Sequence, residues 1–295
     1  MNVGSISPNR VQTEFTHLVL TKFNVDTTYA PSGRGVEPSW LKSRLELFLR
    51  YCYPSVTRQE DVDFRWILFC NARSPEWFKN VIAQLNAIVF PVFVEGLATD
   101  DVFRRKVIEA GVVNTPYLIT TRIDNDDAIS RRHLWHVQRA FRGQEREFIA
   151  FPFGLQLFRG HLYSVYYPHN PFLSLIERVG ENGSVITVFC VPHPKVCSAG
   201  TVRSLWKTPQ WLQVLHSQNI DNSLTGWPRL HSRMHSEFYV SWPDSVSSDN
   251  LFQRVKSSMT RPVGRVSRFI ARTVSQWGSD HSKVVRAEKL RRRRK

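Results

Sequence analysis

Short apolar segments alternate with amphipathic segments over the first half of the chain, and this alternation restricts the folds that the sequence can adopt. Four apolar segments of six or seven residues read as buried strands. Between them, apolar residues recur every three or four positions, which predicts helices. We therefore predict an α/β fold, with a parallel sheet that carries helices on both faces. The predicted strands are 17–22, 64–70, 89–94 and 117–123, and the predicted helices are 39–51 (ended by Pro54), 75–85, 100–108 and 130–141.

The pattern changes in the second half of the chain. Segments 148–153, 162–167 and 185–191 read as strands, with no long helix between them. We expect this half to be a mixed extension of the same sheet, so that residues 12–240 form one catalytic domain. Residues 241–295 differ in composition and are predicted to be a Ser-rich connector, a basic amphipathic helix and an Arg-rich tail.

Most of the net charge lies at the C-terminal end. The chain carries a formal net charge of +15, and residues 250–295 account for +12 of it, with 14 Lys and Arg against two acids. A body that binds nucleic acid would spread its basic residues over a face of the fold, so we expect no nucleic-acid partner. Four cysteines without metal-site spacing indicate reduced thiols in a cytoplasmic protein.

Segment 261–277 has the pattern of a basic amphipathic helix. Its arginines recur at spacings of four, three and four, and apolar residues that include Trp277 follow the same rhythm on the other side. Such a helix suits an anionic membrane surface, and the charge run 291–295 adds to the attraction. We expect residues 261–295 to hold the protein peripherally at the inner face of the cell membrane. A helix packed on the catalytic domain is the alternative.

Three carboxylates follow the fourth predicted strand, at Asp124, Asp126 and Asp127. Ligands bind at this edge of open α/β sheets, and clustered carboxylates repel one another unless a cation lies among them. Oxygen ligands select a hard cation, so the loop predicts a Mn²⁺ or Mg²⁺ site. A solvated acidic turn before a helix is the simpler alternative. An EF-hand is excluded, because Ile129 and Trp135 stand at its Gly and Glu positions.

The acidic segment resembles the Asp-x-Asp region of GT-A glycosyltransferases, and the chain more narrowly resembles the rhamnosyltransferase family of bacteria. The resemblance covers roughly residues 15–200, and its strongest match is 120–129. Lys22 stands where the family pattern leads us to expect Arg. The resemblance implies a GT-A-like nucleotide-sugar-binding sheet flanked by helices. The other matching segments are 17–24, 40–41, 47–48, 52–59, 64–67, 170–177 and His193.

This resemblance implies roles for the acidic loop and its neighbours. Asp126 is the first expected metal ligand and Asp124 the second, because alternate residues of an extended segment face the same way. His193 is the expected third ligand, with a loop histidine held by prolines as the alternative. The metal would neutralise charge on the leaving diphosphate. Asp127 is expected to bind sugar hydroxyls, and Arg122 to orient a carboxylate, contact phosphate or form a plain salt bridge.

An inverting transfer requires a base that takes the proton of the acceptor hydroxyl. Inversion is what the family name implies, because a dTDP-β-L-rhamnose donor would then give an α-linked product. Glu177 ends an apolar run, where burial would favour such a base; pairing with Arg178 is the alternative. The candidates for donor binding are Thr21, Lys22, Asn24, Arg73, Arg122 and Asp124.

These features together predict a metal-dependent glycosyltransferase. It would move a sugar, rhamnose by the family name, from a nucleotide-diphosphate donor to a glycan or lipid-linked acceptor. One alternative is a non-catalytic basic α/β module that binds a membrane surface or nucleic acid, but such a module has no use for a metal cluster on its sheet edge. The other is a phosphohydrolase that uses the same acids, for which we find no later Lys and acid pair.

The tail prediction is tested by truncation after Asn250. We expect the truncated protein to keep activity on soluble acceptors and to lose affinity for anionic vesicles in a cosedimentation assay. Vesicle binding by the full chain should also weaken with salt, because exposed charges are screened within about 8 Å at physiological ionic strength. Insoluble truncated protein, together with a full chain that ignores vesicles at low salt, would show instead that the helix packs on the domain.

Overall fold

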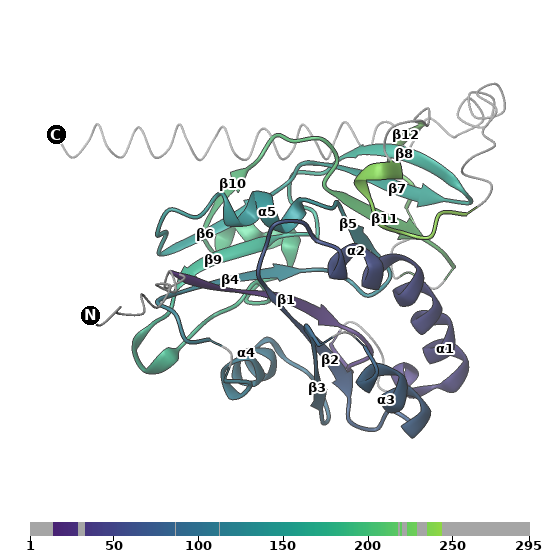
Figure 1. The fold of residues 1–295 in the computed structure, drawn as a ribbon, viewed down its shortest axis with the longest axis horizontal. Helices are drawn as coiled ribbons and strands as arrows, with labels where there is room; N and C mark the ends of the chain where they lie inside the picture. The colour runs from purple at the N-terminus through teal and green to yellow at the C-terminus, as the bar shows by residue number, and fades with distance from the viewer. Residues whose placement is uncertain are drawn as a thin grey trace, which may run out of the picture.

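The computed structural model describes part of the chain, shown as the coloured ribbon in Figure 1. The predicted amphipathic helix and tail over 261–295 lie outside the described residues, as does most of the predicted connector 241–260. Within the described part, no helix is long and apolar enough to cross a bilayer. The described residues are 14–28, 33–85, 87–111, 113–217, 219, 223–228 and 235–243.

The described residues form two sheets, and the first has seven strands in the order β10-β6-β9-β4-β1-β2-β3. Strand β1 pairs in parallel with β2 and β4, and β2 pairs in parallel with β3, as the alternation of strands and helices predicts. Strand β9 runs antiparallel to both β4 and β6, and β10 is parallel to β6. Its strands are β1 (Phe15–Lys22), β2 (Arg65–Asn71), β3 (Val89–Val94), β4 (Tyr117–Arg122), β6 (Arg146–Ala150), β9 (Ser174–Arg178) and β10 (Thr201–Ser204).

Helices cover both faces of this sheet, as predicted. Neighbouring residues of β1 point to opposite faces, so Val19 belongs to one buried hydrophobic cluster and Leu18 and Leu20 to another. Apolar residues of α1, α3 and α5 join the cluster of Val19, and those of α4 join the other. The helices are α1 (Pro38–Leu47), α2 (Tyr53–Thr57), α3 (Glu76–Ala83), α4 (Asp100–Glu109) and α5 (His133–Gln138).

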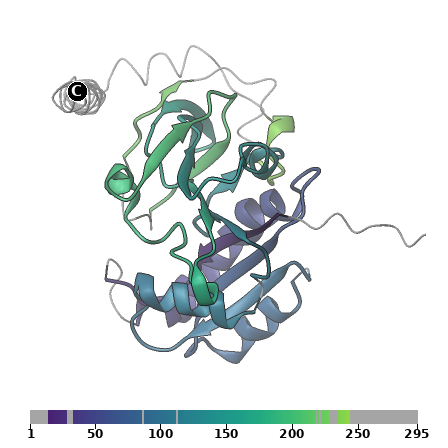
Figure 2. The ribbon, with the colours of Figure 1, turned by 90° about the vertical axis from the view of Figure 1, so that its left-hand side faces the viewer.

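The second sheet has five strands in the order β12-β8-β7-β11-β5, and it is a difference from the single extended sheet that the sequence predicts. Figure 2 shows it, in green, above the purple and blue N-terminal half. Within the described part of the second half, only β6, β9 and β10 extend the first sheet. The strands of the second sheet are β5 (Ala128–Ile129), β7 (Phe153–Phe158), β8 (His161–Tyr166), β11 (Trp211–Leu215) and β12 (Trp227–Pro228).

The predicted strand at 185–191 is wrong. This segment is irregular, although Val185, Val188 and Phe189 are buried against the first sheet. A buried coil and a buried strand have the same apolar composition, so the pattern could not separate them. The segment that does join the sheet between β4 and β6 is β9, which lies earlier in the chain.

The first predicted helix continues past Pro54 instead of ending there. A π-helical turn, Phe48–Cys52, follows α1 directly and leads into α2, where Pro54 occupies the first turn. A proline is tolerated at that position, because the backbone N–H that it lacks has no partner in a first turn. The helix predicted over 130–141 is shorter, and forms only as α5. Short 3₁₀ turns complete the described structure at Arg34–Val36, Glu181–Gly183, His193–Ser198 and His235–Glu237.

The two sheets meet at Trp211, whose ring lies over the backbone of Gly154. The Trp211 ring stacks on Phe172 at 5.0 Å and donates from Nε1 to the Phe151 carbonyl at 2.8 Å. A Cβ atom at Gly154 would lie 2.0 Å from this ring, a distance that no side chain can occupy. Glycine is therefore required at this position for close packing.

We expect Gly154→Ala to lower the free energy of unfolding by about 3 kcal/mol, because an added methyl group must displace a fixed indole ring. Urea unfolding followed by tryptophan fluorescence measures the change. Gly200→Ala is a matched control, since its Cβ would lie at 3.3 Å or more from the nearest side chains. Equal effects of the two substitutions would contradict this account of the packing.

Candidate active site

The carboxyl ends of the parallel strands β1, β2 and β4 meet at one edge of the first sheet. The acidic loop Asp124 to Asp127 follows β4 at this edge and leads directly into β5 of the second sheet. The loop thus joins the two sheets, and its backbone is fixed at both ends. The residues after β1 and β2 lie at the same edge, as the sequence predicts.

Asp126 is buried, and three side chains from distant parts of the chain converge on one of its carboxylate oxygens. His216 Nε2 donates to Asp126 Oδ2 at 2.8 Å, and Asn219 Nδ2 donates to it at 3.2 Å. Arg44 Nη1 pairs with the same Oδ2 and donates to Asn125 Oδ1 at 3.3 Å. Among the described residues, no hydrogen bond reaches the second oxygen, Oδ1. The carboxylate is anchored through one oxygen and presents the other.

These partners decide the charge of Asp126. Burial would raise the pKa of Asp126, but the hydrogen bond from His216 and the charge of Arg44 outweigh burial and hold it below its ordinary value. Asp126 is therefore an ionised carboxylate inside the protein. The repulsion that the sequence predicts among the three acids is relieved in part by the guanidinium of Arg44, which comes from α1.

Asp127 has a different environment from Asp126. Its side chain is buried, and Oδ1 accepts the backbone N–H of Val214 at 2.9 Å, which ties the loop to β11. Burial and the charges of Asp126 and Asp124 raise the pKa of Asp127 well above its ordinary value. This contact uses one of the two carboxyl oxygens, so the role predicted for Asp127 in binding sugar hydroxyls stays a prediction for the other oxygen.

Asp124 is the most accessible of the three acids, with 38% of its side chain exposed. Arg122 holds it through Nη2 and Nε at 3.1–3.2 Å, a contact that fits both the carboxylate-orienting role and the plain salt bridge predicted for this arginine. Lys22 extends between the rings of Phe103 and Phe189, with Nζ 4.4 and 4.2 Å from their centroids. Burial, and then the charge of Arg122, lowers the pKa of Lys22 to about 8.

His193 lies on the same side of the site as Asp124. The Nδ1 atom of His193 is 2.8 Å from the His169 carbonyl oxygen. Burial lowers the pKa of His193. The charges of Arg122 and Asp124 also act on this imidazole. Asp126, however, takes its histidine contact from His216 and not from His193.

The remaining donor-binding candidates hold the loops of this edge together. Thr21 accepts a hydrogen bond from Trp66 Nε1 at 3.0 Å. Asn24 donates to Ser74 Oγ at 2.8 Å and accepts the backbone N–H of Asn71 at 3.0 Å, so it links the loops after β1 and β2.

Arg73 is the candidate that faces solvent most. Its side chain is 62% exposed, and its Nη2 pairs with the buried carboxylate of Asp26 at 2.9 Å. Asp26 also accepts the side-chain amide of Asn71 at 3.2 Å. An exposed guanidinium fixed at this edge can reach a phosphate, whereas Thr21 and Asn24 are already engaged inside the fold.

Glu177 lies away from this edge. It pairs with Leu118 near the start of β4, about 13 Å along the strand from Arg122. Its buried carboxylate accepts the backbone N–H groups of Ile186 at 2.7 Å and Thr187 at 2.9 Å. Burial raises the pKa of Glu177, as expected, but its carboxylate serves as the hydrogen-bond acceptor for the backbone of an irregular segment. This placement argues against Glu177 as the base and favours a structural role.

Sequence reasoning missed Arg44, His216 and Asn219. One signal could have found Arg44: it follows Leu41 by three residues and precedes Leu45 and Phe48, so it stands on the apolar face of its helix. A charge on such a face needs a buried partner. His216 directly follows β11, but it lies beyond the recognised segments, and nothing in the sequence pairs it with an acid 90 residues earlier.

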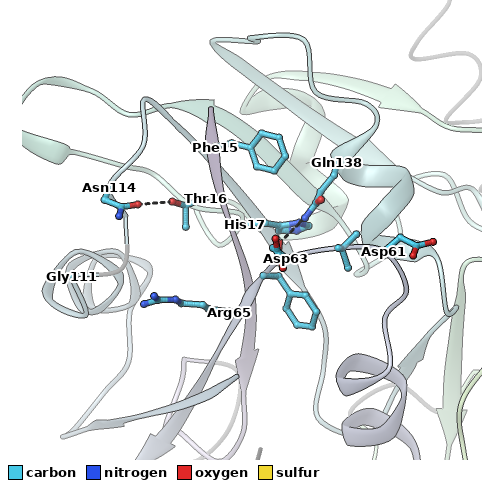
Figure 3. Close-up of a pocket in the computed structure, with 11 residues that line it drawn as sticks. Phe15, Thr16, His17, Asp61, Asp63, Arg65, Gly111, Asn114 and Gln138 are labelled. Carbon is cyan, nitrogen blue, oxygen red and sulfur yellow. Dashed lines mark hydrogen bonds between the residues drawn. The ribbon is translucent and has the colours of Figure 1, made fainter. Parts of the chain in front are cut away.

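A cavity of about 620 Å³ lies at the opposite, amino edge of the first sheet, as Figure 3 shows. Phe15, His17 and Asp63 line it, and Gln138 Nε2 lies 3.1 Å from His17 Nδ1. His17 is buried, and burial lowers its pKa to about 3, so the imidazole is neutral. The cavity is remote from the acidic loop and belongs to a different part of the fold.

The residues of the described chain include no group of three or more His, Cys, Asp and Glu side chains placed to hold a metal ion by themselves. A Mg²⁺ or Mn²⁺ site does not require such a group, because substrate phosphates and water complete the coordination around one or two carboxylates. The open Oδ1 of Asp126 and the exposed carboxylate of Asp124 fit that type of site.

A family model described as "Putative rhamnosyl transferase" matches residues 21–226, which is more than half of the chain. The chain belongs to this family. It is therefore a member of a glycosyltransferase family, and the matched segment includes the acidic loop and His216. No curated protein matches the chain by sequence.

Several solved structures match the chain at low sequence identity. TarS residues 1–349 from S. aureus, in complex with UDP-GlcNAc, has a TM-score of 0.41 at 7% identity, over 70% of this chain and 60% of that one. HddC from Yersinia pseudotuberculosis has a TM-score of 0.34 at 13% identity, over 66% and 91%. The inositol-1-phosphate CTP transferase from T. maritima scores 0.36 at 12% identity, over 70% and 94%. The chain thus spans less than two thirds of the TarS segment.

We expect Asp127→Asn to make the protein progressively more stable than the wild type as the pH rises. In the unfolded chain this carboxyl group ionises near its ordinary pKa of 3.8, whereas the folded protein retains the proton to higher pH. The wild type therefore loses stability between these two values, and asparagine, which can still accept the Val214 N–H, does not.

Urea unfolding of both proteins from about pH 4 to 8 measures this difference. The two stabilities should converge at the acid end of the range. A difference in the free energy of unfolding that stays constant with pH would contradict the raised pKa of Asp127. A difference that closes toward high pH would mean that the pKa of Asp127 is lowered instead.

Proposed function

We propose that the protein transfers a glycosyl residue, with rhamnose as the first candidate, from a nucleoside-diphosphate donor to a glycan or lipid-linked acceptor. The observation that carries this proposal is the ionised, anchored Asp126 at the carboxyl edge of parallel strands. Membership of a rhamnosyltransferase family supports rhamnose as the transferred sugar. The binding of UDP-GlcNAc by TarS agrees with a nucleotide-sugar donor of GT-A type.

A Mn²⁺ or Mg²⁺ ion is part of this proposal. Asp126, through Oδ1, and Asp124 would hold it, while His216 stays bonded to Oδ2 of Asp126. When bound, the ion would neutralise the charge that develops on the leaving diphosphate. The protein's own contribution is to keep the carboxylates ionised and oriented before the donor arrives.

Cationic side chains surround the expected position of the diphosphate. Arg122 is partly exposed beside Asp124, and Lys22 lies close enough to Arg122 for the two charges to influence each other. Lys22 has aromatic rings on its flanks and forms no salt bridge with a described residue, so its ammonium group is available to a phosphate. Arg73 is the third candidate at this edge. We propose these three as the donor's phosphate contacts.

We retain two further points as proposals. The first is an inverting reaction, which rests on the family's rhamnosyl name. The general base for that reaction should lie at the carboxyl edge of the sheet, because Glu177 is engaged elsewhere. Peripheral attachment to an anionic membrane rests on the basic pattern of residues 261–295 alone. Both are compatible with an acceptor that is a lipid-linked glycan.

The test of donor binding is thermal unfolding with UDP, dTDP and GDP, each with and without Mn²⁺. We expect one nucleotide to stabilise the wild type only when the metal is present, by about 2.7 kcal/mol at a hundredfold excess over its dissociation constant. Asp126→Asn should abolish this stabilisation and the transfer reaction, because it removes the anionic ligand.

Asp63→Asn, at the opposite edge of the sheet, is the matched control and should respond like the wild type. Stabilisation of Asp126→Asn equal to that of the wild type would sink the proposed site. Full activity in excess EDTA would sink the metal part of the proposal and leave the sugar transfer in place.

A further inference from the structure

Arg44 stands apart from the other arginines of the described chain in both its burial and its partner. Only 9% of its side chain is exposed, and it meets a carboxylate that is 8% exposed and lies 82 residues later in the sequence. The Arg44 guanidinium also lies 5.2 Å from the centre of the Trp40 ring. A buried cation of this kind is fixed in position and cannot swing out to follow a ligand.

The segment that follows the helix of Arg44 contacts the residues just after the acidic loop at several successive points. Ser55 Oγ accepts the backbone N–H of Ile129 at 3.3 Å, and Gln59 Nε2 donates to the Ser130 carbonyl at 2.7 Å. Glu60 donates its backbone N–H to the Arg131 carbonyl at 2.9 Å. The stretch from α1 to Glu60 therefore braces β5 and the residues after it, and Arg44 is its contact with the acids.

Arg44 contacts one of the two carboxylate oxygens of Asp126, Oδ2. Arg44, His216 and Asn219 all reach Oδ2 of Asp126, so the side chain cannot rotate without breaking three interactions. Oδ1 is left for a ligand. Repulsion between Arg44 and a divalent ion is offset when the ion arrives with the donor, because the diphosphate brings at least as much negative charge as the ion brings positive charge.

We infer that Arg44 is a positioning residue for sugar transfer: it holds the Asp126 side chain turned so that Oδ1 faces the metal and diphosphate. This inference rests on the proposed function and adds to it a residue outside the acidic loop. Groups that orient metal ligands typically change metal affinity or activity by 10–100-fold when they are removed. An arginine that only stabilised the helix would act independently of Asp126.

The experiment is a double-mutant cycle on the binding of UDP in the presence of Mn²⁺, with calorimetric dissociation constants for the wild type, R44M, D126N and R44M/D126N. We expect R44M to weaken binding 10–100-fold, and R44M/D126N to bind no more weakly than D126N. Arg44→Lys, which keeps the cation, should recover part of the loss. R142M, which removes an exposed arginine paired with Glu147 at 2.7 Å, is the matched control.

The outcomes separate this inference from the proposed function. Wild-type affinity in R44M, or losses that multiply in the double variant, would overturn the positioning role while leaving the donor site intact. Should R44M not fold, R44Q and R44K replace it in the same cycle, and equal binding by the two would overturn the inference. A wild type that binds neither UDP, dTDP nor GDP with Mn²⁺ would overturn the proposed function, and the inference with it.

Discussion

A buried carboxylate stays ionised only where the chain brings donors and positive charge to it. Asp126 receives both from outside its own loop: a guanidinium from α1 and an imidazole and an amide from beyond β11. These contacts join the N-terminal helix, the acidic loop and the second sheet at one point. The geometry of the candidate site is thus a consequence of how the whole domain packs.

The parallel core of the first sheet and the acidic edge could be predicted, because both leave local signals. Buried strands such as β2 are continuous apolar runs, and carboxylates directly after β4 fall at the edge where strand ends converge. The family resemblance was confirmed by the family model, which covers the acidic loop. The mistaken strand at 185–191 shows the limit of this reasoning, since burial alone makes a segment apolar.

The partners of the acids could not be predicted from pattern. Asp126 and Asp127 are neighbours in sequence, yet one is held ionised by Arg44 and the pKa of the other is raised by burial. That difference arises from residues 80 to 90 positions away, which no local periodicity encodes. Glu177 illustrates the converse: its burial was foreseen, but the backbone groups that it serves are visible only in three dimensions.

The long separations between Arg44, Asp126 and His216 also bear on the order in which the protein folds. Closing loops of 82 and 90 residues costs chain entropy, which local helices and neighbouring strands do not incur to the same extent. During synthesis, Asp126 emerges well before His216. The full set of partners of Asp126 therefore requires the chain beyond β11 to be in place, and ligand binding at this edge would report that it is.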